Sequence, residues 1–202
     1  MGVQIVNEHQ TCDYLAAPSM VRTQKFLQCL AKGPEVINSA FIDACLEKGE
    51  RLDPNDYILC DKENEEKLGI KLNVAVARAR ANRGRLLANV PIYCTADIKN
   101  GYAAYQAIAE ANGAIFKIYR ARSGTTIRPT TAEEDGGAPP EPVYLLTSDK
   151  PEERPLWPRF EKMAVDGHME PRIVSPDWLL DVAIRQELTF NPRFLMSARD
   201  GS

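Results

Sequence analysis

The sequence predicts an α/β protein made of two copies of one unit, each a small, mostly parallel four-stranded sheet flanked by helices. The first reason is that short blocks recur in the same order in both halves of the chain, which indicates a duplicated unit. The matched blocks are Tyr14-Leu15 with Tyr144-Leu145, Lys25-Phe26 with Arg159-Phe160, Gly33 with Gly167, 38–42 with 175–179, and 52–59 with 188–195. The second reason is that strand-like and helix-like segments alternate in the later copy, an order typical of a parallel sheet with helices on both faces.

The first copy, residues 1–60, is predicted to contain three short strands and two helices. We expect the strands at 3–6, 14–17 and 35–38, which are short runs of the kind that form buried parallel strands. Apolar residues at helical spacing predict the first helix over 22–32, and Gly33-Pro34 ends it. Ser39 is the expected N-cap of the second helix, which Gly49 closes.

Residues 61–87 are predicted to form a linker that contains a helix. Glutamates gather at its start and arginines at its end, the charge order that a helix dipole favours. An apolar stripe suited to packing on a neighbouring domain is formed by Leu68, Leu72, Val76 and Ala79. Three interpretations stay open for the arginines: a solvated or interdomain face, a nucleic-acid contact, or an import signal. These arginines are Arg78, Arg80, Arg83 and Arg85.

The second copy, residues 88–202, is predicted to be complete. Its expected elements are strand 90–95, helix 102–112, strand 115–119, strand 143–146, helix 157–165, strand 172–174 and helix 176–186. Residues 122–141 are rich in Gly, Pro, Thr and Glu and can bury little apolar surface. We therefore predict a disordered insertion at about 122–141.

Composition and motifs disfavour several classes of function. The net charge of −3 over 202 residues argues against a general nucleic-acid or membrane-surface binder, which is usually basic. The five cysteines form no C-x-x-C pair and the two histidines lie far apart, so no metal site is expected. The sequence has no glycine-rich phosphate loop or G-x-S-x-G motif, and no apolar run approaches the ~18 residues of a membrane span. We expect a binding protein without cofactors, catalytic residues or a membrane partner.

Two stretches of the chain carry a family resemblance. Residues 21–33, VRTQKFLQCLAKG, open a helix that is followed by a strand and by an aromatic residue near the head of an apolar helix. This pattern resembles the BRCT domain, in which the aromatic residue fills the core; here it is Phe41 in the first copy and Trp178 in the second. Together with residues 79–95, ARANRGRLLANVPIYCT, it is similar to the C-terminal BRCT pair of fungal multi-BRCT scaffold proteins of the DNA-damage response.

The resemblance implies a tandem BRCT pair that acts as a nuclear, monomeric binding module. Its partner would be a protein tail carrying phosphoserine or phosphothreonine, from a histone or a repair factor. The phosphate-binding residues that it implies are Lys25 and Thr23, and the peptide-binding residues are Arg22, Leu27, Lys99 and Asn100. Without the resemblance, Lys25 and Arg22 would be interpreted as ordinary surface charges.

The sequence departs from the family pattern at its front. The family's other phosphate ligands, a Ser or Thr followed by Gly at the end of the first strand, would lie before Gly2. The first repeat therefore lacks its first strand and helix, and we expect the natural protein to be longer. In the second copy the equivalent turn is Cys94-Thr95-Ala96, where alanine replaces the glycine, and Arg159 stands in place of the lysine. A second phosphate pocket is not expected there.

Two other functions stay open at this point. The first is a module that holds another protein without any dependence on phosphate, through the linker helix and the contact between the repeats. The second is DNA binding through the linker arginines, which the acidic balance of the chain disfavours and which would weaken steeply with salt.

Overall fold

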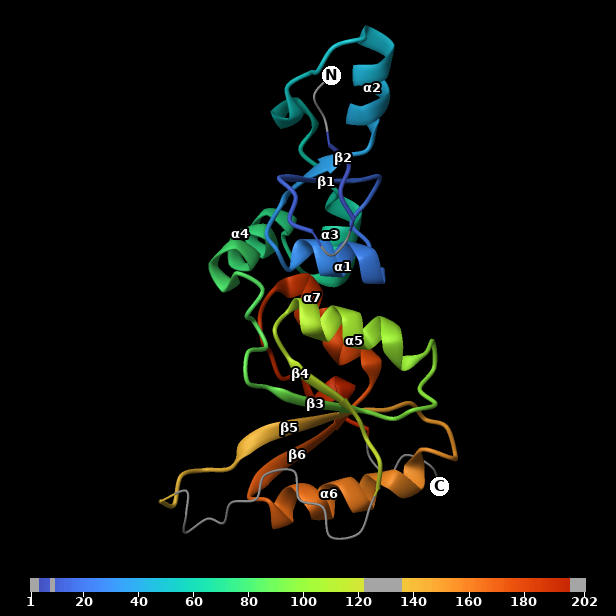
Figure 1. The fold of residues 1–202 in the computed structure, drawn as a ribbon, viewed down its shortest axis with the longest axis vertical. Coiled ribbons are helices and arrows are strands. Elements are labelled where there is room, and N and C mark those ends of the chain that lie inside the picture. The colour runs from blue at the N-terminus through green and yellow to red at the C-terminus, as the bar shows by residue number, and fades with distance from the viewer. Residues whose placement is uncertain (1–3, 8–9, 122–135, 197–202) are drawn as a thin grey trace. The chain divides into compact units, whose positions relative to one another are not determined.

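The structure, a computed structural model, describes residues 4–7, 10–121 and 136–196 (Figure 1). The chain divides into two compact units. The first unit comprises residues 1–86 and 180–188, and the second comprises 87–179 and 189–202. The division therefore falls inside α7 (Pro176–Arg185). Within the described residues, no helix is both long and apolar enough to cross a membrane.

The first unit has a two-stranded parallel sheet among its described residues. Its elements are β1 (Tyr14–Ala17), α1 (Gln24–Leu30), β2 (Glu35–Asn38), α2 (Ala40–Lys48), the 3-10 turn Pro54–Tyr57, α3 (Lys62–Leu68) and α4 (Leu72–Asn82). The strands at 14–17 and 35–38 are confirmed, and they pair with Tyr14 opposite Glu35. The strand predicted at 3–6 is wrong over its described part, since residues 4–6 lie in no strand and Ile5 is 93% exposed. An apolar run becomes a strand only where it pairs with a neighbouring strand, and residues 4–6 pair with no strand among the described residues.

The turn after α1 depends on a glycine. Gly33 has a φ of +73°, and a Cβ at this position would lie 2.6 Å from Cγ and 2.8 Å from the backbone N of Arg80 in α4. The Arg80 Nε also donates to the Gly33 carbonyl at 2.9 Å, and its guanidinium pairs with Glu35 at 2.7 Å. Gly33 thus supplies both a left-handed conformation and the space in which the linker helix approaches the sheet.

Helix α2 begins with a different cap from the one expected. The Asn38 Oδ1 accepts from the Ala40 N–H at 2.9 Å, whereas the Ser39 side chain makes no capping hydrogen bond. Gly49 ends the helix in a left-handed conformation, as predicted. On the inner face Phe41 is buried and packs edge to face on Tyr57, with ring centroids 5.4 Å apart.

The linker contains two helices, α3 and α4, instead of one. Gly69, with a φ of 62°, ends α3, and α4 begins three residues later. A residue in this conformation stops a helix by turning its N–H back onto the last carbonyls, here those of Glu65 and Glu66. The predicted apolar stripe is confirmed in α4, where Leu72, Val76 and Ala79 are buried.

The second unit contains a four-stranded parallel sheet in the order β4-β3-β5-β6. Its elements are β3 (Pro91–Cys94), α5 (Tyr102–Ala111), β4 (Ile115–Ile118), β5 (Glu141–Leu146), α6 (Trp157–Asp166), β6 (Met169–Val174) and the start of α7. Helices α5 and α6 lie on opposite faces of the sheet (Figure 1). The predicted α/β arrangement is therefore confirmed for this unit. Of the predicted insertion, residues 122–135 lie outside the described residues, 136–140 form a turn and a short loop, and Glu141 begins β5.

The duplication extends to strand register. Tyr14 lies opposite Glu35 in the first unit and Tyr144 opposite Arg172 in the second. Each unit also closes with an isolated antiparallel bridge, which joins Ile37 to Ile58 and Val174 to Leu195. The bridges equate Ile58 with Leu195, so the match of 52–59 with 188–195 made from the sequence is wrong by one residue.

Trp178 is buried in the second unit, where it packs on Tyr144. Its side chain is fully buried and stacks on the Tyr144 ring, with centroids 4.0 Å apart and planes inclined by 12°. Its Nε1–H donates to the Thr189 carbonyl at 3.3 Å. The prediction that this aromatic residue fills the core is confirmed.

Candidate functional site

The junction before α1 carries the predicted phosphate-binding residues. Arg22, Thr23 and Lys25 are all exposed there. Thr23 is the N-cap of α1, with φ −75° and ψ 154°, and its Oγ1 accepts from the Phe26 N–H at 3.4 Å. Because a hydroxyl has one donor and two acceptor lone pairs, this cap leaves the Thr23 proton free to donate to a ligand.

Lys25 lies in the first turn of α1 with an uncommitted charge. It makes no hydrogen bond or ion pair with any residue that the structure describes. Two other basic side chains of the first unit are engaged: the Lys32 Nζ donates to the Gln10 carbonyl at 2.8 Å, and Arg80 pairs with Glu35. The Lys25 ammonium therefore keeps its donors for a ligand.

The inner face of α1 belongs to the core. Phe26 is 4% exposed and Leu27 is completely buried. Leu27 was predicted to line a peptide cleft; its side chain is fully buried, and its role toward a peptide stays a prediction. A position two residues after Lys25 lies on another face of the helix.

The loop that leads into this junction is held by Asp61, which the sequence did not single out. The Met20 N–H donates to its Oδ2 at 2.7 Å, and Asn64 donates to the same carboxylate from Nδ2 at 2.8 Å and from N at 3.2 Å. The Asn64 side chain, followed by the Met20 N–H, lowers the pKa of Asp61. Its position before α3 marks it as an N-cap, but nothing local indicates the contact 41 residues away.

Lys99 and Asn100, the other predicted peptide contacts, belong to the second unit. Both are exposed in the loop before α5. Asn100 has a φ of 72° and donates from Nδ2 to the Tyr105 hydroxyl at 3.4 Å, and that hydroxyl donates to the Lys99 carbonyl at 3.1 Å. Their role toward a peptide stays a prediction.

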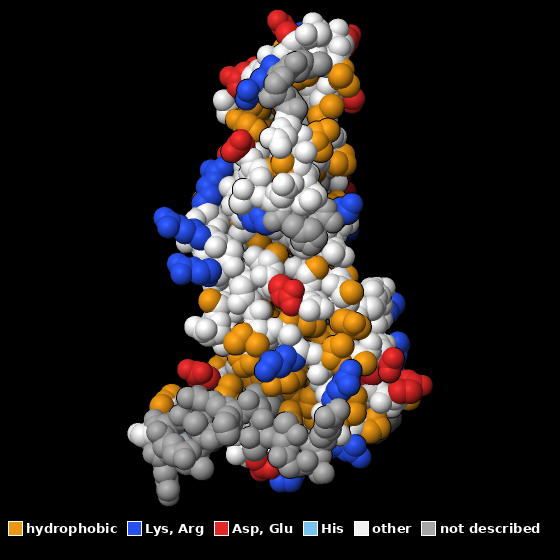
Figure 2. Space-filling model, viewed as in Figure 1, with side chains coloured by type: hydrophobic (Ala, Val, Ile, Leu, Met, Phe, Trp, Pro, Cys, Tyr) orange, Lys and Arg blue, Asp and Glu red, His pale blue; other side chains and the backbone are white. Residues whose placement is uncertain are grey.

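Lys and Arg side chains gather on the side of the molecule where α4 lies (Figure 2). Two of the four linker arginines are committed within the first unit. Arg78 pairs with Glu187 at 2.7 Å, and Arg80 pairs with Glu35. Arg83 and Arg85 are exposed. A structural role thus accounts for half of the predicted cluster.

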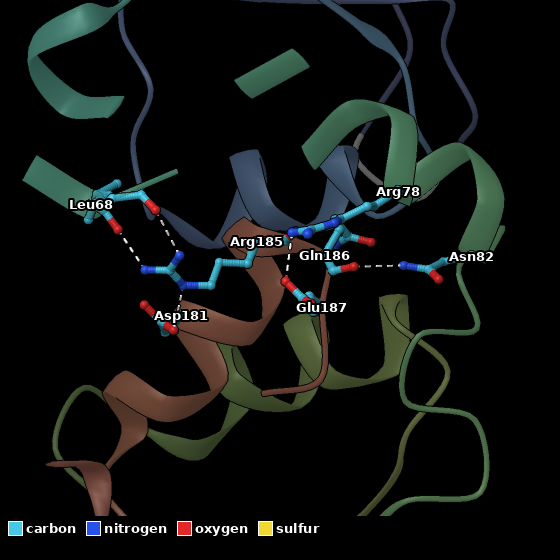
Figure 3. A network of polar contacts seen from close by, with 8 residues as sticks. Leu68, Arg78, Asn82, Asp181, Arg185, Gln186 and Glu187 are labelled. Atoms are coloured by element: carbon cyan, nitrogen blue, oxygen red, sulfur yellow. Dashed lines mark hydrogen bonds and ion pairs between the residues drawn. The ribbon is translucent and has the colours of Figure 1, made fainter. Parts of the chain in front are cut away.

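The end of α7 is joined to the linker helices by a polar network (Figure 3). Arg185 donates to the Leu68 carbonyl at 2.6 Å and the Gly69 carbonyl at 3.0 Å, while its Nε bonds to Asp181 at 2.8 Å. Asn82 donates to the Gln186 carbonyl at 3.0 Å. The guanidinium therefore satisfies carbonyls at the end of α3, which have no partner inside that helix. These contacts lie within the first unit and are distinct from the Lys25 junction.

In the second unit, the equivalent strand end is closed. Thr95 is buried, and its hydroxyl donates to the buried Glu153 carboxylate at 2.7 Å. Arg159, in place of the lysine, is exposed on α6. Across the parts of the chain that the structure describes, no group of three or more His, Cys, Asp or Glu side chains is placed to hold a metal ion.

Comparison with known proteins agrees with this architecture. The family model of the BRCT domain of Regulator of Ty1 transposition protein 107 matches residues 1–59. The crystal structure of the BRCT5-BRCT6 domains of S. pombe Brc1 superimposes with a TM-score of 0.67 at 29% identity, over 88% of this chain and 79% of that chain. Residues 1–59 thus match a BRCT family model, and the fold over most of the chain is similar to that of a tandem BRCT pair.

The relatives of this chain include a BRCT-containing protein and a mediator of the DNA damage checkpoint. BRCT-containing protein 1 of Schizosaccharomyces pombe is 29% identical over 201 residues, which cover 96% of this chain and 22% of that protein. Human mediator of DNA damage checkpoint protein 1 is 28% identical over 99 residues, which are 49% of this chain and 5% of that protein. A structure of Rtt107p with a phosphorylated histone shares the fold at 16% identity, with a TM-score of 0.64 over 96% of this chain and 79% of that chain. The chain thus spans about a fifth of the first relative's length.

Proposed function

We propose that this chain is a tandem BRCT pair that binds a phosphoserine- or phosphothreonine-containing protein tail within a nuclear DNA-damage-response scaffold. The observation that carries the proposal is the uncommitted ammonium of Lys25 beside the exposed Thr23 hydroxyl and Arg22. Asp61 holds the loop that presents these side chains through its bond to the Met20 N–H.

The chemistry of these groups suits a phosphorylated tail. A phosphate group carries a charge of about −1.5 to −2 at neutral pH and three strong acceptor oxygens. Lys25 supplies a point charge with three donors, and Thr23 supplies a hydroxyl donor. Arg22 supplies a planar fork that matches a carboxylate, such as a peptide C-terminus or an acidic side chain after the phosphate.

The comparisons support the class of partner. The Rtt107p structure holds a phosphorylated histone, and two of the relatives are named for DNA-damage functions or BRCT domains. On this ground we propose a phosphorylated histone tail as the first partner to test, with a phosphorylated repair factor as the second.

The test is a calorimetric titration of the full chain with a histone-tail peptide that carries one phosphoserine near its C-terminus. The unphosphorylated peptide and a peptide with aspartate at the same position are the controls. We expect saturable binding of the phosphopeptide and at least tenfold weaker binding of both controls, because charge-assisted bonds to a dianion are lost. Equal binding of the phosphorylated and unphosphorylated peptides would favour the phosphate-independent interaction module instead.

A further inference from the structure

The second unit contains a buried carboxylate at the carboxyl ends of two neighbouring strands. Glu153, in the loop between β5 and α6, is 2% exposed. Its Oε2 accepts from the Thr95 hydroxyl at 2.7 Å, the Thr147 hydroxyl at 2.8 Å and the Ser148 N–H at 2.7 Å. Its Oε1 accepts from the Ser148 hydroxyl at 2.9 Å. Four donors from the ends of β3 and β5 therefore converge on one anion.

All four donors are neutral. The two basic residues of the same loop are engaged elsewhere, since Lys150 donates to the Asp97 carbonyl and Arg154 pairs with Asp149. Burial raises the pKa of Glu153, but the four hydrogen bonds outweigh it and the pKa lies below its usual range. The site thus stabilises a negative charge with oriented dipoles alone. Anion-binding sites built from backbone N–H groups and hydroxyl groups work in the same way.

Two of the four donors, the Thr95 and Thr147 hydroxyls, belong to residues held in place by contacts that do not involve Glu153. The Thr95 N–H bonds to the Leu146 carbonyl at 3.0 Å, and the Thr147 N–H bonds to the Val174 carbonyl at 3.1 Å, so the sheet fixes both backbones. The Thr147 hydroxyl also accepts from the Trp157 Nε1–H at 3.0 Å, which directs its proton toward the carboxylate. The Thr95 and Thr147 side of the pocket is therefore preorganised independently of its present occupant.

We propose that Thr95, Thr147 and Ser148 form an oxyanion pocket whose resident ligand is the chain's own Glu153. This side chain closes the second repeat to external anions, and the vacated pocket accepts a tetrahedral oxyanion such as inorganic phosphate or sulfate. The inference concerns the second unit alone and holds whether or not the first repeat binds phosphate.

The test is a titration of the full chain with inorganic phosphate at constant ionic strength, with chloride as the balancing salt, followed in amide nuclear magnetic resonance spectra. Three proteins are compared: the parent, Glu153→Ala, and the matched control Glu152→Ala, which removes the exposed carboxylate next in sequence. We expect saturable shifts of the Thr95 and Ser148 amides in Glu153→Ala only. A folded Glu153→Ala whose amides respond to phosphate no more than the parent's do would overturn the proposal.

A second measurement covers a Glu153→Ala variant too unstable for a resolved spectrum. The urea midpoint of each protein is measured in phosphate and in chloride at equal ionic strength. A ligand that binds only the folded state stabilises it, so the phosphate-induced rise of the midpoint should be larger for Glu153→Ala than for the parent and Glu152→Ala. Equal rises in all three proteins would mean that Glu153 is an ordinary buried hydrogen-bonding group and that no oxyanion pocket exists.

Discussion

Replacing Gly33 by alanine should destabilise the first unit through two separable effects. The first is conformational: a φ of +73° costs a residue with a Cβ about 1–3 kcal/mol. The second is steric, because the new Cβ would lie 2.6 Å from the Arg80 Cγ and 2.8 Å from its backbone N. The backbone of a helix cannot move aside as a side-chain end can, so overpacking adds about 1–3 kcal/mol. The total of about 2–6 kcal/mol is a large part of the ~5–15 kcal/mol that stabilises a domain.

Gly49→Ala provides the matched control. Gly49 has a similar φ of +68°, but nothing lies within 4 Å of its Cβ position. Both variants therefore carry the conformational cost, and only Gly33→Ala carries the steric cost. Hydrogen exchange of the β1 and β2 amides reports on the first unit directly, whereas the fluorescence of Trp157 and Trp178 reports on the second. We expect faster hydrogen exchange in Gly33→Ala than in Gly49→Ala, because only Gly33→Ala carries the steric cost. Equal exchange in the two variants would refute the close approach of α4 to the turn at Gly33.

Three further substitutions test the contacts described above. Arg185→Ala should cost about 1–3 kcal/mol by removing a charged donor to two carbonyls, measured as a lower urea midpoint, whereas the exposed control Arg85→Ala should change it little. Because hydrogen bonds lower the folded-state pKa of Asp61, its stabilising effect is present above the unfolded pKa of about 3.9 and is lost as the pH falls through the folded pKa. In a plot of the free energy of unfolding against pH, Asp61→Asn should therefore reduce the loss of stability at acid pH. An unchanged loss in this variant would contradict the stabilising role of the Asp61 carboxylate. Trp178→Ala should cost about 3–5 kcal/mol because it empties the stack on Tyr144, and a loss under 1 kcal/mol in calorimetric stability would show that the ring does not support the core.

Periodicity and turn residues predicted most of the elements because each depends on a local signal. The strands at 14–17 and 35–38 match the structure, and Gly49 ends α2 as its conformation requires. The strand at 3–6 was predicted from the same kind of signal and is wrong over its described part. A strand also needs a hydrogen-bonding neighbour, and a sequence window does not contain that information.

The candidate sites were only partly predictable. Lys25 and Thr23 were identified through the family resemblance, and their exposure agrees with a surface role. Asp61 and Glu153 were missed because their partners are Met20 and Thr95, 41 and 58 residues away. Hydrogen bonds between residues so far apart leave no periodic pattern in the sequence. The two carboxylates and their partners come together only in the folded chain.

The role of Lys25 in phosphate recognition is tested most directly by a double-mutant cycle. The full chain and its Lys25→Met variant are each titrated with the phosphorylated and the unphosphorylated tail peptide, with Lys48→Met as the control for an exposed helical lysine. Loss of one charge-assisted partner should weaken phosphopeptide binding by about 1.5–3 kcal/mol, or about 10- to 150-fold. We predict that Lys25→Met weakens binding of the phosphorylated peptide by this factor and leaves binding of the unphosphorylated peptide unchanged. Lys48→Met should change the affinity for neither peptide. Equal affinity of Lys25→Met and the parent for the phosphopeptide would contradict the assignment of Lys25 as the phosphate ligand.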